Sequence, residues 1–91
     1  MPDAPRFSIV FKKSAVKELA RCEESMKQRI SDAIGHLSVD PLPYGAIKLE
    51  GFENFWRIRI GTFRVVYEIQ ADALIVYVVH IAHRKDIYRR L

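Results

Sequence analysis

Residues 55–67 read FWRIRIGTFRVVY, and this stretch decides the fold. Large apolar side chains alternate with arginines on both sides of Gly61-Thr62, which is the pattern of a β-hairpin closed by a two-residue loop. Such a loop sets the register, from Ile60 opposite Phe63 back to Trp56 opposite Tyr67. One face of the hairpin is then apolar and suited to burial, and it carries Trp56, Ile58, Ile60, Phe63, Val65 and Tyr67. The opposite face carries Arg57, Arg59 and Arg64.

This arginine-bearing face has two interpretations. The register places Arg59 directly opposite Arg64, and like charges in that position repel by about a few tenths of a kcal/mol. A bound anion would remove the repulsion, and the guanidinium group suits phosphate particularly well. The alternative is a solvated strand face, on which arginines are common and Glu68 partly neutralises the charge. The hairpin alone leaves both interpretations open.

The remaining elements follow from the apolar spacing along the chain. They are a strand at 7–11, helices at 14–21 and 25–37, strands at 55–60, 63–70 and 73–82, and a helical turn from about Arg84. Pro41 and Pro43 end the helical region, because proline cannot continue a helix. The order predicts an α+β fold. Its small antiparallel-rich sheet combines one N-terminal strand with a three-strand meander and packs against an N-terminal helical hairpin.

The first predicted helix is amphipathic. Ala15, Val16 and Leu19 share the side that we expect to be buried. Lys17 and Glu18 share the side that we expect to face solvent.

Size and charge limit the possible functions. The chain has 91 residues, of which 49% are hydrophobic, so we expect residues 1–91 to form a single domain. Its formal net charge is +4 and its pI is about 9.5, which favours a polyanionic partner.

The cysteine usage and the N-terminal sequence indicate a compartment. The single Cys22 cannot form an internal disulfide, so a reducing cytoplasm is expected. No Cys/His spacing resembles a zinc site, and we predict neither a metal nor a cofactor. The N-terminus lacks a signal peptide, and the apolar run at 73–79 is far shorter than the roughly 18 residues of a membrane span.

The C-terminal segment concentrates polar chemistry. It contains His80, His83, Arg84, Lys85, Tyr88, Arg89 and Arg90. Because a meander returns the third strand alongside the hairpin, we expect this segment to lie beside the arginines of residues 57–64. That proximity favours an anion-binding surface over a merely solvated face.

The order of elements and four sequence blocks resemble the RelE/ParE superfamily of toxin–antitoxin toxins, specifically its RelE-like branch. The blocks are KLEG at 48–51, FWRIRIG at 55–61, FRVVY at 63–67 and HIAHRKDIYR at 80–89. The resemblance covers nearly the whole chain. It implies cleavage of messenger RNA in the ribosomal decoding site and neutralisation by an antitoxin encoded beside the toxin. ParE-like members share the fold but act on DNA gyrase.

The resemblance also implies roles for individual residues. Arg57 and Arg59 stand where RelE-type toxins place paired basic residues, often lysines. Arg64 matches an arginine of the next strand, and Arg84 matches one that follows the last strand. Tyr88 matches a C-terminal tyrosine that stacks on or contacts the substrate nucleotide.

The arginine pair departs from the lysines of the family, and this affects the expected chemistry. Arginine stays protonated, so Arg57 and Arg59 are improbable general bases. Related toxins use a histidine near the C-terminus, which makes His83 the best local candidate for proton transfer, with His80 behind it. A capping or surface role for His83 is an equally open alternative.

RNA cleavage without a metal uses the RNA 2′-hydroxyl as the nucleophile. It requires a base for that hydroxyl, positive charge near the phosphorane and an acid for the leaving 5′-oxygen. The arginines suit the charge role, and further RNA contacts are expected from Lys48, Lys85, Arg89 and Arg90. The predicted function is therefore a ribosome-dependent endoribonuclease of messenger RNA. The alternatives are a DNA gyrase inhibitor and a non-catalytic protein that binds only its antitoxin.

Overall fold

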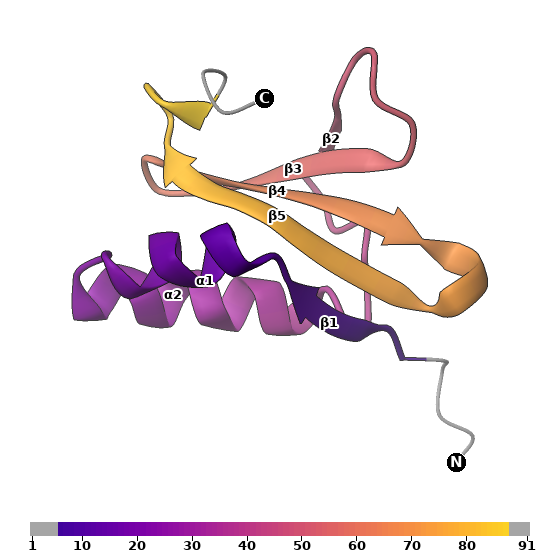
Figure 1. Cartoon of the computed structure of the whole chain (residues 1–91), viewed down its shortest axis with the longest axis horizontal. Helices are drawn as coiled ribbons and strands as arrows, with labels where there is room; N and C mark the ends of the chain where they lie inside the picture. The colour runs from indigo at the N-terminus through magenta and orange to yellow at the C-terminus, as the bar shows by residue number, and fades with distance from the viewer. Residues whose placement is uncertain (1–5, 88–91) are drawn as a thin grey trace.

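The computed structural model describes residues 6–87 of the chain. Its elements are β1 (Ser8–Phe11), α1 (Lys13–Ala20), α2 (Glu24–His36), β2 (Ile47–Lys48), β3 (Phe55–Ile60), β4 (Phe63–Gln70), a 3₁₀ turn (Ala71–Ala73) and β5 (Ile75–His83). The strands form one sheet in the order β1-β5-β4-β3-β2, and both helices cover the same face of it (Figure 1). No helix among residues 6–87 is long and apolar enough to cross a membrane.

The sheet confirms the predicted α+β class. β1 runs parallel to β5, while β2, β3, β4 and β5 pair antiparallel in succession. The helical hairpin was predicted within one residue at each end. β2 was not predicted, because two residues are too few to show an alternating pattern.

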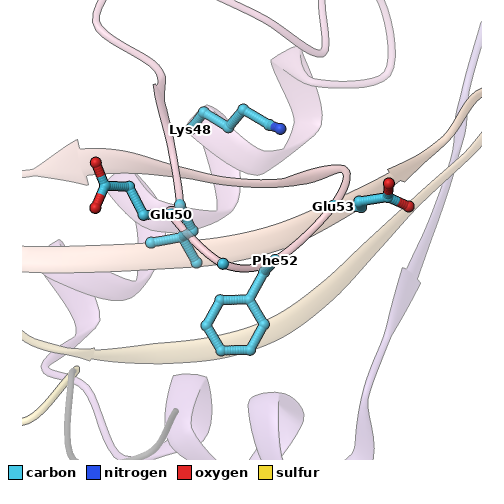
Figure 2. A pocket seen from close by; sticks show the side chains of 6 residues that line it. Lys48, Glu50, Phe52 and Glu53 are labelled. Atoms are coloured by element: carbon cyan, nitrogen blue, oxygen red, sulfur yellow. The ribbon is translucent and has the colours of Figure 1, made fainter.

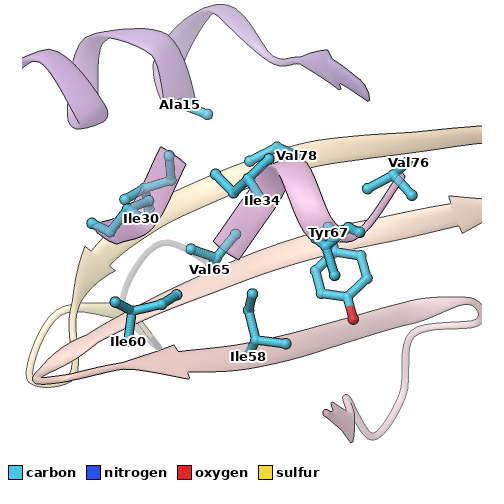
Figure 3. Close-up of a cluster of buried hydrophobic side chains, with 11 residues drawn as sticks. Ala15, Ile30, Ile34, Ile58, Ile60, Val65, Tyr67, Val76 and Val78 are labelled. Carbon is cyan, nitrogen blue, oxygen red and sulfur yellow. The ribbon is translucent and has the colours of Figure 1, made fainter. Parts of the chain in front are cut away.

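The core lies between the helices and the sheet (Figure 3). The helical side contributes Ala15 of α1, Ile30 and Ile34 of α2, and Leu37 directly after α2. The sheet contributes Ile58 and Ile60 of β3, Val65 and Tyr67 of β4, and Val76, Val78 and Ile81 of β5. Fully burying an aliphatic side chain of this size contributes about 1.5–3 kcal/mol. The apolar face predicted for the hairpin is therefore the face that holds the helices.

The predicted hairpin register is confirmed at every pair. Arg59 faces Arg64, Ile60 faces Phe63, and the pairing continues to Trp56 opposite Tyr67. Gly61 has a φ of 59°, the positive value that the first central residue of a type II′ turn requires.

The prediction that the last strand begins at Ala73 is wrong. Residues 71–73 form the 3₁₀ turn and Leu74 adopts a φ of 54°, so β5 begins at Ile75. A β-bulge also interrupts the pairing of β4 with β5, since Val66 faces His80 while Tyr67 faces Val78. The extra residue, Val79, explains why Val78 and Ile81 both face the core despite their odd spacing.

The predicted orientation of α1 is wrong at two positions. Glu18 is buried, with 8% of its surface exposed, whereas Val16 is 52% exposed. The reason is the position of α1 beside β5, where Oε1 of Glu18 accepts a hydrogen bond from the backbone N–H of Ile81 at 3.0 Å. A carboxylate thus occupies a position on α1 that the sequence pattern assigns to solvent.

Candidate functional site

The sheet face opposite the helices gathers the predicted arginines. Arg57 and Arg59 of β3 and Arg64 of β4 alternate with residues that face the core, so all three side chains belong to the outer face. Arg59 is exposed, and Arg57 and Arg64 are half-buried. Together with Arg84, which follows β5, these residues are called the arginine surface below.

A backbone hydrogen bond brings Arg84 to the same end of the sheet. The N–H of Arg84 donates to the carbonyl oxygen of Thr62 at 2.7 Å, so the turn after β5 is attached to the β3–β4 turn. In the register of β4 with β5, Arg64 faces Ala82. The expected proximity of the strand end and the hairpin is therefore present, and exposed Lys85 follows directly. Tyr88, Arg89 and Arg90 lie outside the described residues.

The arginine surface is cationic because few carboxylates reach it. Within residues 6–87, neither Arg57 nor Arg59 nor Arg84 forms an ion pair. Nη1 of Arg64 donates to the carbonyl oxygen of Phe63 at 3.3 Å. Glu68 lies on the same face, but its Oε1 accepts from the side-chain amide of Gln70 at 2.8 Å.

A small apolar cluster forms the floor beside these arginines. Leu49, Val66, Ala82 and Ile87 are buried together on the outer face, and Phe55 packs against them. These residues come from the loop before β3, from β4, from β5 and from the C-terminal turn. The cluster fixes that turn against the sheet and thereby supports the position of Arg84.

The two histidines of β5 lie on different faces. His83 pairs with Phe63, which belongs to the core face, and their rings meet edge to face with centroids 5.8 Å apart. Nδ1 of His83 accepts the N–H of Lys85 at 3.2 Å. His80 pairs with Val66 of the outer face, and its Nδ1 is 3.8 Å from Oε1 of Glu18. The backbone register places His80 on the outer face, but its ring is largely buried and lies against Glu18 of α1 at the edge of β5.

Lys48 stands apart from the arginine surface. It pairs with Trp56, whose side chain packs against the core cluster, so the register places it on the other face at the sheet edge. The loop that follows encloses a hollow of about 520 Å³, lined by residues 48–53. Figure 2 shows that Glu50 and Glu53 of this loop point to opposite sides and do not converge on a common point.

The aromatic side chains of the hairpin are structural. Tyr67 is fully buried, and its hydroxyl donates to the carbonyl oxygen of Pro41 at 2.7 Å. Burial and the nearby Asp40 raise the pKa of this phenol well above its usual value. Trp56 is partly buried and packs against the same core cluster, so both rings lie on the face opposite the arginines.

One hollow next to Arg59 was missed by the sequence interpretation. It is lined partly by His36 and Tyr44, which no motif distinguishes. The only signal was Pro43-Tyr44-Gly45, an aromatic residue between two turn-forming residues. Within residues 6–87 no group of three or more metal-binding side chains converges.

Comparisons with known proteins agree with this architecture. The sequence profile described as "ParE toxin of type II toxin-antitoxin system, parDE" matches residues 9–88. Toxin RelE3 of Methanocaldococcus jannaschii is 31% identical over 84 residues, which cover 88% of this chain and 93% of that protein.

Solved structures show the same fold. A chain of the RelB–RelE antitoxin–toxin complex from Methanococcus jannaschii matches with a TM-score of 0.72 at 28% identity, over 90% of this chain and 98% of that chain. The archaeal RelE–RelB complex from Pyrococcus horikoshii OT3 gives a TM-score of 0.78 at 24% identity, over 87% of this chain and 96% of that chain. At that identity the second match speaks for the fold alone.

Proposed function

This chain belongs to the ParE toxin family of type II toxin–antitoxin systems and is a RelE-like toxin, and we propose that it is a ribosome-dependent endoribonuclease of messenger RNA. The observation that carries the proposal is the arginine surface. Arg59 and Arg64 face each other across a strand pair, and Arg84 is fixed at the same end of the sheet by the Thr62 carbonyl. An RNA phosphate would offset their mutual repulsion.

The proposed reaction needs no metal. The 2′-oxygen of the RNA forms a bond to the adjacent phosphorus while the bond from phosphorus to the 5′-oxygen breaks. The 2′-hydroxyl proton passes to a base, and the leaving 5′-oxygen receives a proton from an acid. The products are a 2′,3′-cyclic phosphate and a 5′-hydroxyl. Arg57, Arg59, Arg64 and Arg84 act by stabilising the negative charge of the phosphorane.

Proton transfer falls to groups other than the arginines, because guanidinium does not lose its proton. We assign it to His83 and Tyr88, as the sequence predicts, and retain His80 as the competing histidine. The strand register favours His80, while the contact of its ring with buried Glu18 of α1 speaks against it. The alternative, His83, is the last residue of β5 and contacts the backbone of Lys85. It therefore lies at the cationic end of the sheet, which favours it for proton transfer.

The proposed partners are the ribosome, messenger RNA and a cognate antitoxin, all in the cytoplasm. The matched chain from Methanococcus jannaschii comes from a complex with a RelB antitoxin, which supports the last partner. We assign to the antitoxin an acidic segment that folds on binding and covers the arginine surface. Lys85, Arg89 and Arg90 are proposed as further RNA contacts, and Lys48 as a contact at the sheet edge.

Mapping of RNA and DNA ends after brief expression in a bacterial cell tests this function. The proposal predicts new 5′-hydroxyl RNA ends inside translated reading frames, and their loss when translation initiation is blocked. DNA breaks without new RNA ends would instead support gyrase inhibition, the activity of ParE-like members. Normal growth without either kind of end would identify a non-catalytic protein.

A further inference from the structure

A hollow of about 380 Å³ lies at the edge of β3, beside α2. β2 pairs only with Trp56 and Arg57, so within residues 6–87 no strand covers the remainder of that edge. The lining consists of Ala33, His36, Pro43, Tyr44, Gly45, Ile58 and Arg59. Ligand pockets typically combine this size with an apolar floor and a few polar groups, which here are the imidazole of His36 and the phenol of Tyr44, while the side chain of Arg59 projects to the outer face beside them.

Tyr44 is held at the mouth of this hollow by an ordered turn. The N–H of Ala46 donates to the carbonyl oxygen of Pro43 at 3.0 Å, and Gly45 has a φ of 92°. These are the features of a type II turn with Tyr44 and Gly45 at its centre. The preceding loop is fixed in turn, because Pro41 accepts the hydroxyl of buried Tyr67.

The Tyr44 side chain contributes little to folding. It is fully exposed to solvent, which is unusual for a large aromatic residue on a well-defined turn. The turn fixes the backbone of Tyr44, so its bare ring can stack on a flat ligand at the cost of ordering one side chain alone. The turn therefore presents an unpacked aromatic ring at the mouth of the hollow.

Arg59 connects the hollow with the arginine surface. It lines the hollow and also faces Arg64 across the hairpin, so a ligand in the hollow lies next to concentrated positive charge. A nucleotide fits both features, because its flat base can enter the hollow while its phosphate meets the positive charge. An apolar side chain of a protein partner would fill the floor, but it would leave Arg59 and His36 without a counterpart.

We propose that this hollow binds one nucleobase of the single-stranded RNA whose phosphates occupy the arginine surface. Tyr44 stacks on the base, and His36 forms a hydrogen bond with the edge of the base. The hollow is then a subsite for a nucleotide next to the one that is cleaved. The inference rests on the proposed function, because it places the same RNA strand on the arginine surface.

Binding of a short single-stranded RNA tests the subsite. The probe is a fluorescein-labelled oligonucleotide of uniform 2′-O-methyl RNA, which cannot be cleaved, together with copies that lack the base at one position each. Fluorescence anisotropy measures binding by the wild-type chain, Tyr44→Ala, Tyr44→Phe, Arg64→Ala and the control Phe52→Ala. Phe52 is also a partly exposed aromatic residue, but it lies on the loop before β3.

The expected result is a loss of affinity of roughly 5- to 150-fold for Tyr44→Ala, the usual effect of removing one base–aromatic stack. Tyr44→Phe should retain wild-type affinity, and Phe52→Ala should change nothing. One abasic probe should weaken wild-type binding by the same factor and should cause no further loss with Tyr44→Ala. Folding is not at issue, because the Tyr44 side chain is fully exposed.

Three outcomes would overturn the inference. Equal RNA affinity of Tyr44→Ala and wild type, with Arg64→Ala still impaired, would remove the subsite and leave the proposed function standing. A Tyr44→Ala chain that binds RNA normally but loses a cognate antitoxin would assign the hollow to the antitoxin. Absence of any RNA binding by the wild-type chain would also overturn it, while RNA-end mapping in cells would still decide the proposed function.

Discussion

Glu18 of α1 accepts the backbone N–H of Ile81 in β5 at 3.0 Å, across 63 residues of sequence. β1 pairs with β5 only as far as Val78, so this contact continues the attachment of β5 where its strand neighbour ends. The same carboxylate lies 3.8 Å from Nδ1 of His80. Glu18 thus joins the first helix to the strand that leads to Arg84.

Loss of the Glu18 carboxylate should destabilise the fold. Glu18→Ala leaves the buried N–H of Ile81 without its acceptor, which costs about 1–3 kcal/mol. Glu18→Gln retains an acceptor oxygen and should cost less. Urea denaturation followed by circular dichroism measures both, and equal stability of Glu18→Ala and wild type would contradict the role given to this contact.

The two glycines at 61 and 35 should respond oppositely to alanine. Gly61 has a positive φ, and an added Cβ would lie 3.3 Å from Nη1 of Arg29 and from Cε of Met26. Gly61→Ala should therefore destabilise by about 1–2 kcal/mol. Gly35 lies in α2 with nothing within 4 Å of an added Cβ, so Gly35→Ala should stabilise by about 0.5–1 kcal/mol.

Thermal unfolding of the two variants provides the measurement. In a domain of this size, 1 kcal/mol shifts Tm by about 4–8 °C. An unchanged or raised Tm of Gly61→Ala would contradict the turn geometry at Gly61, and a lowered Tm of Gly35→Ala would contradict the open helical position given to Gly35.

Tyr67 should make stability decline in strongly alkaline solution. The pKa of its phenol is raised in the folded chain, chiefly by burial, so the folded state resists ionisation. The unfolded state ionises near pH 10, and its stabilisation by that ionisation lowers the free energy of unfolding as the pH rises further. Below pH 10 this contribution is fully present.

Tyr67→Phe separates this effect from other alkaline titrations. The variant should lose about 0.5–1.5 kcal/mol at neutral pH, because the partly buried carbonyl of Pro41 loses its donor. Its stability should then fall less steeply than that of wild type between pH 10 and pH 11. Parallel declines in the two proteins would show that Tyr67 is not the group responsible.

The histidine that transfers the proton is identified by paired substitutions. If His83 acts as proposed, His83→Ala should remove one limb of the pH–rate profile of RNA cleavage, and His80→Ala should retain it. The reverse result would transfer the role to His80, as the strand register favours. An unchanged profile in both variants would leave the arginines and Tyr88 as the reacting groups. The profile should span about pH 5.5 to 9, which brackets the ordinary histidine pKa near 6.5.

The hairpin could be predicted from sequence because its information is local. Alternation and the Gly61-Thr62 loop together determine the pairing of Arg59 with Arg64. The face of His83 could not be predicted, because the bulge at Val79 shifts the alternation of β5 and no local pattern marks it. Glu18 was misassigned for a similar reason, since the partner that buries it is 63 residues away.

The hollow at Tyr44 could likewise be predicted only in part from the sequence. Its turn was predictable from Pro43 and Gly45, but its walls come from α2 and β3, which are distant in sequence. Sequence patterns therefore give the elements and the cationic face. The placement of side chains at the edges of the sheet depends on tertiary packing.

The arginine surface is the central claim, and single-turnover cleavage of messenger RNA on programmed ribosomes tests it most directly. Arg64→Ala and Arg84→Ala should each lower the cleavage rate by about 10²- to 10³-fold, the usual effect of losing a preorganised donor. Arg→Lys at the same positions should retain part of the rate, because the charge remains. Arg21→Ala, an exposed arginine at the end of α1, is the matched control and should cleave at the wild-type rate. Full-rate cleavage by both Arg64→Ala and Arg84→Ala would contradict the account.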